Sequence, residues 1–457
     1  MLNKIISYCF YMLFLLTPLF WSSFNYELFE YNKMILVYGF TVIIVGVWLL
    51  KMISEKAFIL KRTPLDIPLI LFLGANILST IFSIDLHTSI WGYYSRSNGG
   101  LLSTTSYLLL YWAFVSNMDL AKVKIALKFG LVSGVLISLW AILEHFGVSP
   151  SCVILRGEFS DSCWIQDVQA RVFATLGQPN WLAAYLAMLI FPALYFLLHA
   201  SGKHKRIAYY MSLIIMYLAF TFTYSRGPTL GLLAGLAIFL VFYFKEKLIK
   251  LWILIVISSF LIVNLLFGSA LTNFRIIAKF AAPARPGITI PPPTGGSSGT
   301  QLENGGTESG QIRLIVWKGA LDIFKHYPIF GSGLETFAYS YYQYRPVEHN
   351  LTSEWDFLYN KAHNEYLNYL ATTGTVGFAT YMAVIITFVY WSIRKLLGKK
   401  MNEQLFLVVA LLASYISYLI YNFFLFSVVI IAVFFYLFPA LVVVATDSLK
   451  SFKWPKK

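Results

Sequence analysis

The chain has 457 residues, of which 58% are apolar, 18% aromatic and 12% charged. Soluble domains carry about 25% charged residues, so this composition excludes a soluble enzyme, a disordered chain and a secreted disulfide scaffold, and predicts an integral membrane protein. The formal net charge of +14 does not require a nucleic-acid partner, because membrane proteins concentrate Lys and Arg in their cytoplasmic connections. We expect membrane lipids, and no nucleic acid, among the partners.

Apolar runs that approach or exceed the length needed to cross a bilayer core, about 20 helical residues, alternate with charged clusters along the chain. They predict about twelve transmembrane helices, at residues 5–21, 34–50, 67–84, 100–116, 125–146, 173–198, 207–223, 228–244, 251–268, 373–392, 404–420 and 424–445. With both termini in the cytoplasm, the basic clusters Lys51–Arg62, Lys203–Arg206, Lys245–Lys250 and Arg394–Lys400 fall on the cytoplasmic side, as the positive-inside rule requires.

The predicted fold is therefore an all-α integral membrane protein with one large, partly helical extracytoplasmic loop between helices 9 and 10. We divide the chain into residues 1–268 with helices 1–9, residues 269–372 with this loop, and residues 373–457 with helices 10–12 and a basic cytoplasmic tail. Within the loop, residues 283–310 are rich in Pro, Gly and Ser and predict a flexible linker.

Residues 313–327 of the loop predict an amphipathic helix that lies on the membrane surface or caps the bundle. Their apolar Leu314, Trp317, Leu321 and Phe324 recur every three or four residues, opposite Lys318, Asp322 and Lys325. The tyrosines that follow are expected either to anchor the loop at the interface or to stack on sugar rings; they are Tyr339, Tyr341, Tyr342 and Tyr344.

Three cysteines occur in the chain. Cys9 lies in the first apolar run, whereas Cys152 and Cys163 share one predicted outer loop. A disulfide between these two and a pair of free thiols are both open, depending on the redox compartment. The sequence contains neither a CxxC nor an HxxxH pattern, so it predicts no metal site of that kind.

Ionisable residues gather at the predicted outer ends of the helices rather than inside them, which argues against a proton relay through the membrane. Arg226 lies in TYSRGPTLG, a tight reversal in which Ser225 or Gly227 can cap the next helix. The free N–H groups of that helix end and the Arg fork both suit a lipid-borne phosphate. The alternative is an Arg that snorkels to lipid headgroups.

Arg96 and Arg171 lie in comparable outer segments and favour an anion site. Arg313, at the head of the predicted amphipathic helix, either contacts phosphate or only anchors that helix. His363 precedes the tenth predicted helix; its imidazole, with an ordinary pKa near 6.5, can accept a proton at neutral pH, although a lone His is often structural.

Several of these segments resemble the O-antigen ligase and O-antigen polymerase superfamily of membrane glycan transferases. His363 and Asn364, followed after nine residues by Gly374 and Gly377, resemble its signature of His and Asn or Ser, nine residues, and two glycines three apart. Similar recurring segments are SRG at 225–227, GQPNWLA at 177–183 and HYPIFGSGLETF at 326–337.

The resemblance implies an inverting, metal-independent transfer in the bacterial cytoplasmic (inner) membrane, with the active site extracytoplasmic and no cofactor. It implies an undecaprenyl-diphosphate-linked glycan as donor and a lipid, glycan or protein hydroxyl as acceptor. In this reading His363 and Arg226 are catalytic, and Arg226, Arg171, Arg96 and Arg313 bind the diphosphate. The spacing after His363 favours a ligase over a polymerase.

Two other classes of function are open from the residues. A transporter or flippase would show repeats in its two halves and polar groups near the membrane midplane, and neither is evident. A metal-dependent glycosyltransferase could use Glu27 and Glu30 as its acids, but no Asp-x-Asp pair supports this, and two solvated interfacial carboxylates are the better interpretation.

Overall fold

The computed structural model describes residues 1–244, 251–271, 309–446 and 449–451. All but the last two residues of the predicted linker 283–310 lie outside this part of the chain. Within it the protein is mainly helical, which confirms the all-α membrane class. The only strands among the described residues are β1 (Lys61–Arg62) and β2 (Lys450–Ser451), which pair antiparallel.

The helices form one bundle, and each of the predicted spans overlaps one of them. Seven are long and apolar enough to cross a membrane: α1 (Leu2–Leu19), α2 (Glu30–Glu55), α6 (Leu120–His145), α8 (Pro179–His199), α10 (Arg226–Phe244), α14 (Glu365–Leu396) and α15 (Glu403–Phe424). Beside them lie α9 (Lys203–Phe222), which is less apolar, and the shorter α3 (Asp66–Ile81), α5 (Leu101–Asn117), α11 (Leu251–Phe267) and α16 (Val429–Ala445). The exact number that crosses a membrane stays a prediction.

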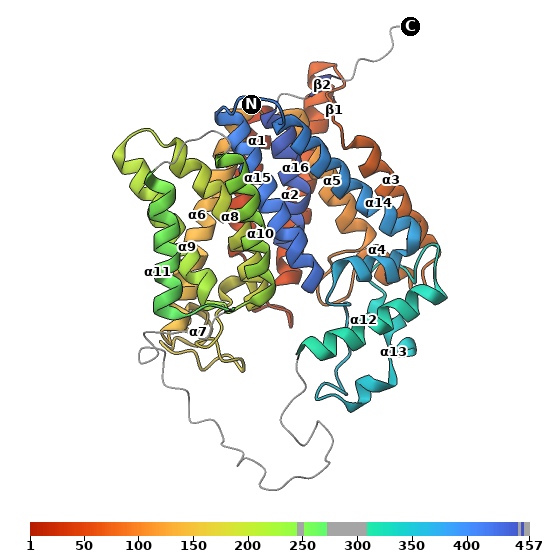
Figure 1. Cartoon of the computed structure of the whole chain (residues 1–457). Coiled ribbons are helices and arrows are strands. Elements are labelled where there is room, and N and C mark those ends of the chain that lie inside the picture. Colours follow the sequence, from red (N-terminus) through yellow and green to blue (C-terminus); the bar gives the residue numbers. More distant parts are fainter. Residues whose placement is uncertain (245–250, 272–308, 447–448, 452–457) are drawn as a thin grey trace.

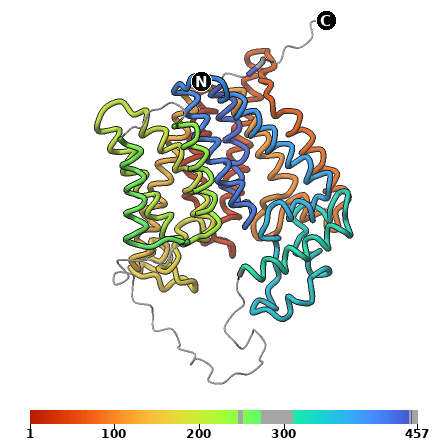
Figure 2. Tube along the Cα trace, viewed as in Figure 1, coloured from red at the N-terminus to blue at the C-terminus, as the bar shows by residue number. Residues whose placement is uncertain are grey.

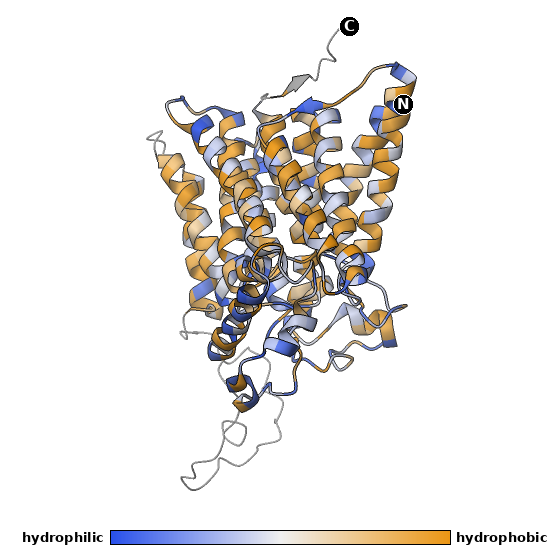
Figure 3. Cartoon of the chain, turned by 90° about the vertical axis from the view of Figure 1, so that its right-hand side faces the viewer, coloured by the Kyte–Doolittle hydropathy of each residue, from blue (hydrophilic) through white to orange (hydrophobic). Residues whose placement is uncertain are grey.

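Hydrophobic residues cover the bundle along most of its length, and hydrophilic ones collect toward its two ends (Figure 3). The centre is filled by α8 and α16, which are apolar on all sides and buried over almost their whole length, as expected for core helices. Figure 2 shows α16, near the C-terminus, among helices of the N-terminal half; it packs against α5, α6 and α2.

A row of glycines lets α10 approach α15 closely. A Cβ atom at Gly231 would lie 2.3 Å from the carbonyl oxygen of Ser417, and one at Gly235 would lie 2.7 Å from that of Ala413. Small residues at such positions allow two membrane helices to pack backbone against backbone. The contact continues to Gly227, whose added Cβ would lie 3.2 Å from Cβ of Phe424, so the first turn of α10 is held against the last turn of α15.

A lobe projects from the end of the bundle opposite the N-terminus (Figure 1). It contains α12 (Ser309–His326), α13 (Phe337–Tyr344) and the short helix η2 (Val347–Leu351). The helices α4 (Leu86–Trp91) and α7 (Pro150–Arg156) lie at the same end. We call this the lobe end of the bundle.

The side of α12 that packs in the lobe is not the apolar stripe singled out from the sequence. Leu314 and Leu321 of that stripe are exposed, at 62% and 41%. A second stripe is buried against α13 and α14 instead; its members are Ile312, Val316, Ala320 and Ile323. Tyr341 is fully buried in the same cluster and shares a hydrogen bond of 2.7 Å with Nδ1 of His349, so it can serve neither as an interfacial anchor nor as a sugar platform.

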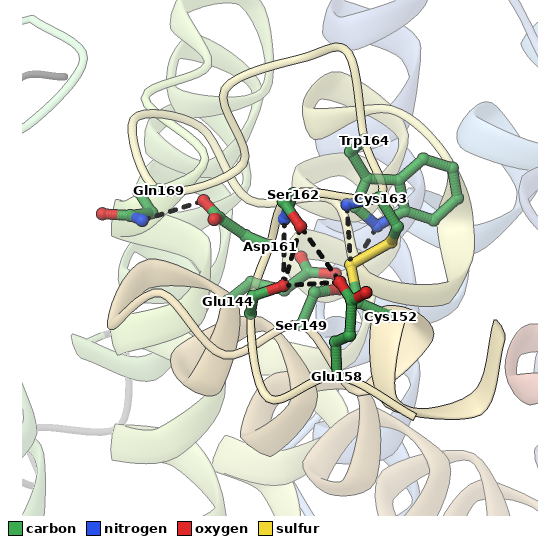
Figure 4. The surroundings of a disulfide bond; sticks show 10 residues. Glu144, Ser149, Cys152, Glu158, Asp161, Ser162, Cys163, Trp164 and Gln169 are labelled. Atoms are coloured by element: carbon green, nitrogen blue, oxygen red, sulfur yellow. Dashed lines mark hydrogen bonds between the residues drawn. A yellow bond between two sulfur atoms is a disulfide. The ribbon is translucent and has the colours of Figure 1, made fainter. Parts of the chain in front are cut away.

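Cys152 and Cys163 form a disulfide, which settles the alternative that the sequence left open. The bond closes the loop that follows α7 (Figure 4). In this loop the indole N–H of Trp164 donates to Oγ of Ser149 (3.2 Å), and the Ser149 hydroxyl donates to Glu144 (3.2 Å). The loop is thereby fixed onto the last turn of α6.

Candidate functional site

The candidate site centres on the four-residue connection between α15 and α16, Leu425–Val428. Two buried carboxylates hold this connection: Glu365 accepts the backbone N–H of Ser427 (3.2 Å), and Glu30 accepts that of Val429 (2.7 Å). The Tyr421 hydroxyl donates to the carbonyl of Phe426 (3.1 Å). The Phe426 ring is therefore fixed in place, only 2% exposed.

Arg96 lies between two aromatic rings at this point. Its guanidinium carbon is 5.0 Å from the ring centroid of Phe426 and 5.2 Å from that of Trp181 in the first turn of α8. Aromatic faces attract a guanidinium but accept few of its N–H groups. The Nη1 atom is buried and has no hydrogen-bond partner among the described residues, so Arg96 retains an unused donor suited to an anion.

His363 contacts the same Phe426 ring edge to face, at 5.2 Å between centroids, and contacts Tyr359 in the same way at 5.2 Å. It stands just before α14, whose N-cap Asn364 accepts the backbone N–H of Leu367 (3.1 Å). Burial, and then the positive charges of Arg313 and Arg96, lower the pKa of His363 to about 3. The imidazole is therefore neutral at physiological pH and able to accept a proton.

Arg313, the weakest of the candidates from the sequence, links the residues around His363 to Arg171. It lies in the first turns of α12, and its charge acts on both His363 and Arg171. Burial lowers the pKa of Arg313, while the neighbouring Tyr359, Tyr421 and Glu354 counteract this effect. Its helix is fixed to the bundle by Trp317, whose ring lies 5.6 Å from that of Phe423 in α15.

Arg171 is held by the backbone reversal between α9 and α10. Its Nε donates to the carbonyl of Thr223 (3.0 Å), and its Nη2 donates to Oγ of Ser225 (3.2 Å). The Ser225 hydroxyl thus positions this arginine. Arg226 follows directly as the first residue of α10 and is exposed at the lobe end.

Glu144 fixes the segment that carries Arg171. This carboxylate is fully buried and accepts the backbone N–H groups of Phe173 (3.2 Å) and Ala174 (2.8 Å), besides the Ser149 hydroxyl. Figure 4 shows Glu144 beneath the loop closed by the disulfide. No local pattern in the sequence indicates that Glu144 accepts N–H groups from a backbone segment about 30 residues away.

The structure therefore brings Arg96 and His363 together on Phe426 and places Arg313 within electrostatic reach of both His363 and Arg171. Arg171 is bonded to Ser225, the residue before Arg226. Sequence reasoning missed Phe426, Trp181 and the carboxylates behind them. Trp181 lies within GQPNWLA and could have been found there; Phe426 lies in an apolar run without any distinguishing pattern.

The two glycines of the His363 signature have a structural reason. Gly374 interrupts α14 with φ 63° and ψ −166°, and the turn Pro328–Gly333 docks on the break. A Cβ at Gly374 would lie 2.4 Å from the carbonyl of Ile329, and one at Gly377 would lie 2.2 Å from Thr373. Gly374 therefore provides the docking surface that joins the lobe to α14, whereas Gly377 leaves room for the Thr373 side chain of the same helix.

The alternative site at Glu27 and Glu30 is occupied by structural contacts. Glu27 accepts the backbone N–H groups of Phe29 (3.1 Å) and Tyr31 (2.7 Å), and Glu30 is fully buried against Val429. Over the described part of the chain, no three His, Cys, Asp or Glu side chains are grouped so as to hold a metal ion.

Comparison with known proteins gives one positive result. Residues 211–382 match the family model described as O-antigen ligase. This range includes Arg226, Arg313 and His363 and ends shortly after the two signature glycines. The match confirms the resemblance noted in the sequence. No curated protein matches the chain.

Proposed function

We propose that the chain transfers a glycan from a polyprenyl diphosphate, such as undecaprenyl diphosphate, to an acceptor hydroxyl. The match of residues 211–382 to the O-antigen ligase family supports the general role of a membrane glycan transferase in polysaccharide biosynthesis. The observation that carries the proposal is the convergence of several arginines on one neutral, partly buried histidine. The reaction takes place at the outer face of the cytoplasmic membrane.

The arginines bind the diphosphate of the donor. Arg96 and Arg313 are partly buried, where charge–charge interactions are stronger than in water, whereas Arg171 and Arg226 are exposed. During the reaction the bond between the anomeric carbon and the phosphate oxygen breaks, and negative charge grows on the departing diphosphate. Guanidinium groups already in place stabilise that charge without rearrangement, so the leaving group needs no general acid.

His363 acts as the base. The acceptor oxygen attacks the anomeric carbon from the face opposite the diphosphate, its proton passes to the neutral imidazole, and the configuration of the sugar is inverted. The bound diphosphate also offsets the charges of Arg96 and Arg313. Since those charges lower the pKa of His363 in the free protein, donor binding makes the imidazole a stronger base when the acceptor arrives.

A reconstitution experiment tests the proposal. The purified protein is placed in vesicles with a polyprenyl-diphosphate glycan, EDTA and candidate lipid, glycan and protein acceptors, and release of polyprenyl diphosphate is followed. We expect release with the wild type, and at least a 100-fold loss with His363→Ala or Arg226→Ala. The controls His204→Ala and Arg394→Ala remove the same side chains at the opposite end of the bundle and should leave turnover unchanged.

The products distinguish the variants of the proposal. A glycan joined to a different acceptor identifies a ligase, whereas a longer glycan on the carrier identifies a polymerase. Turnover that persists in His363→Ala contradicts the assigned base, and turnover abolished by EDTA contradicts the metal-independent mechanism. Movement of the glycolipid across the vesicle without any bond cleavage would replace the transferase by a flippase.

A further inference from the structure

A buried ion pair lies behind the candidate site and belongs to none of the roles assigned so far. Nζ of Lys361 contacts Oε1 of Glu335, and the two side chains are only 9% and 5% exposed. The other carboxylate oxygen of Glu335 is buried and has no hydrogen-bond partner within the described residues. Both side chains line an internal polar cavity of about 40 Å³ together with Asn98, Glu365 and Ser427.

The pair touches the two segments that carry the key residues. Lys361 is two residues before His363. Glu335 lies against the segment that carries Arg96: a Cβ added at Gly99 would lie 2.0 Å from Oε1 of Glu335, so this oxygen sits directly on the Gly99 backbone. The pair therefore joins the turn around Glu335, the segment RSNGG and the segment KAHNE, which are far apart in the sequence.

The backbone at these points adopts conformations that are unfavourable for residues with side chains. His363 has φ 51° and Glu335 has φ 61°. Such a conformation persists only where the surroundings of the residue fix it. A buried ion pair adds little net stability, because desolvation offsets the attraction, but it fixes geometry, since neither charge can leave its partner.

We propose that Lys361 and Glu335 are a positioning pair that holds His363 and Arg96 at fixed positions relative to one another. This inference rests on the transferase function proposed above. Neither side chain need touch the substrate: the pair acts through Gly99 on the arginine that binds the diphosphate, and through the Lys361–His363 backbone on the base. Loss of the pair should therefore affect donor binding and chemistry together.

The test is the double variant Glu335→Gln/Lys361→Met, which removes both charges and largely keeps the volume. Replacing both members of a buried pair is often neutral for stability, so the variant should fold. We expect kcat per folded molecule to fall at least tenfold and KM for the donor to rise severalfold. The matched control is Lys318→Met/Glu348→Gln, which removes an exposed pair of the lobe (Nζ to Oε1, 2.5 Å) and should change neither constant.

A purely structural pair gives a different result. It would lower the yield or the melting temperature but leave kcat and KM of the folded fraction at wild-type values, and this outcome overturns the proposal. If the double variant fails to fold, Glu335→Asp serves instead, because it keeps the charge and withdraws the carboxylate from Gly99 by one methylene. Wild-type kcat and KM in folded Glu335→Asp would equally contradict the proposal.

Hydrogen–deuterium exchange separates this proposal from the proposed function. We expect faster exchange in residues 93–99 and 359–364 of the double variant, and not in the control, whatever the activity. Failure of the wild type to release polyprenyl diphosphate contradicts the transferase function. Unchanged exchange in both segments contradicts the positioning pair, even if the wild type is active.

Discussion

Gly374→Ala is the substitution whose effect follows most directly from the structure. Gly374 has φ 63° and ψ −166°, a region essentially restricted to glycine, so alanine carries a strain of about 1–3 kcal/mol. Its Cβ would also lie 2.4 Å from the carbonyl of Ile329 and 2.6 Å from the amide nitrogen of Gly331. Since both neighbours are backbone atoms, the turn Pro328–Gly333 must move away from α14.

That movement breaks backbone hydrogen bonds. Thr375 N–H donates to the carbonyl of Pro328 (2.9 Å) and Val376 N–H donates to that of Ile329 (3.2 Å), directly beside the inserted methyl group. Each such bond contributes about 1 kcal/mol. Strain and lost bonds together give a destabilisation of about 3–5 kcal/mol, or roughly 6–10 °C in melting temperature at about 2 °C per kcal/mol.

The assay is thermal unfolding of the purified protein in detergent, with Gly398→Ala as the matched control. Gly398 also has positive φ, +70°, but no atom lies within 4 Å of its added Cβ, so that variant reports the backbone penalty alone, about 1 kcal/mol. We also expect lower turnover per folded molecule in Gly374→Ala, because the displaced turn leads to Glu335. Equal melting temperatures for the two variants would refute the docking argument.

Three further predictions concern the site itself. Because the pKa of His363 is lowered, its imidazole stays in the base form as the solution is acidified. We therefore expect kcat/KM, measured from pH 4 to 8, to show no decline near pH 6.5. Replacing Arg313 by Met should raise the pKa of His363 and shift the acid-side decline of kcat/KM to higher pH. Glu144→Ala leaves the N–H groups of Phe173 and Ala174 buried without an acceptor, at a cost of about 1–3 kcal/mol each. We expect a lower melting temperature and a higher KM for the donor. A KM that is unchanged in the folded fraction would show that Arg171 is placed by other contacts. Phe426→Leu removes the aromatic ring that contacts both Arg96 and His363, and the cation–π contact with Arg96 alone is worth about 1 kcal/mol. We therefore expect about a fivefold rise in the KM for the donor. An unchanged KM would exclude a role for this ring in placing Arg96.

The helical membrane architecture could be predicted because it depends on composition and the lengths of apolar runs. Even α9, which begins with the basic segment Lys203–Arg206, coincides with a predicted span. The packing of α12 could not be predicted in the same way. Its sequence contains two apolar stripes, and the positions of α13 and α14 decide that Ile312 and Val316, rather than Leu314 and Leu321, are buried.

The charged members of the site were predictable for a similar reason. An Arg or His at the end of an apolar run stands out, which is why Arg96, Arg171, Arg226 and His363 were candidates; Arg313 was a candidate because it begins the predicted amphipathic helix. Their roles stay predictions. The residues that place them do not stand out. Phe426 is one of 39 phenylalanines, and the partners of Glu30 and Glu144 are backbone N–H groups 399 and 30 residues away, which no local pattern encodes.

The arrangement of charges explains why the site should need its substrate. Arg96 and Arg313 are partly buried and Arg171 is exposed, and among the described residues no carboxylate forms a salt bridge with any of the three. The nearby acids Glu30, Glu144 and Glu365 accept backbone N–H groups instead. These three carboxylates therefore position loops rather than neutralise the arginines. In the proposed function the donor diphosphate supplies negative charge next to the arginines, so its binding should stabilise the fold as well as start the reaction.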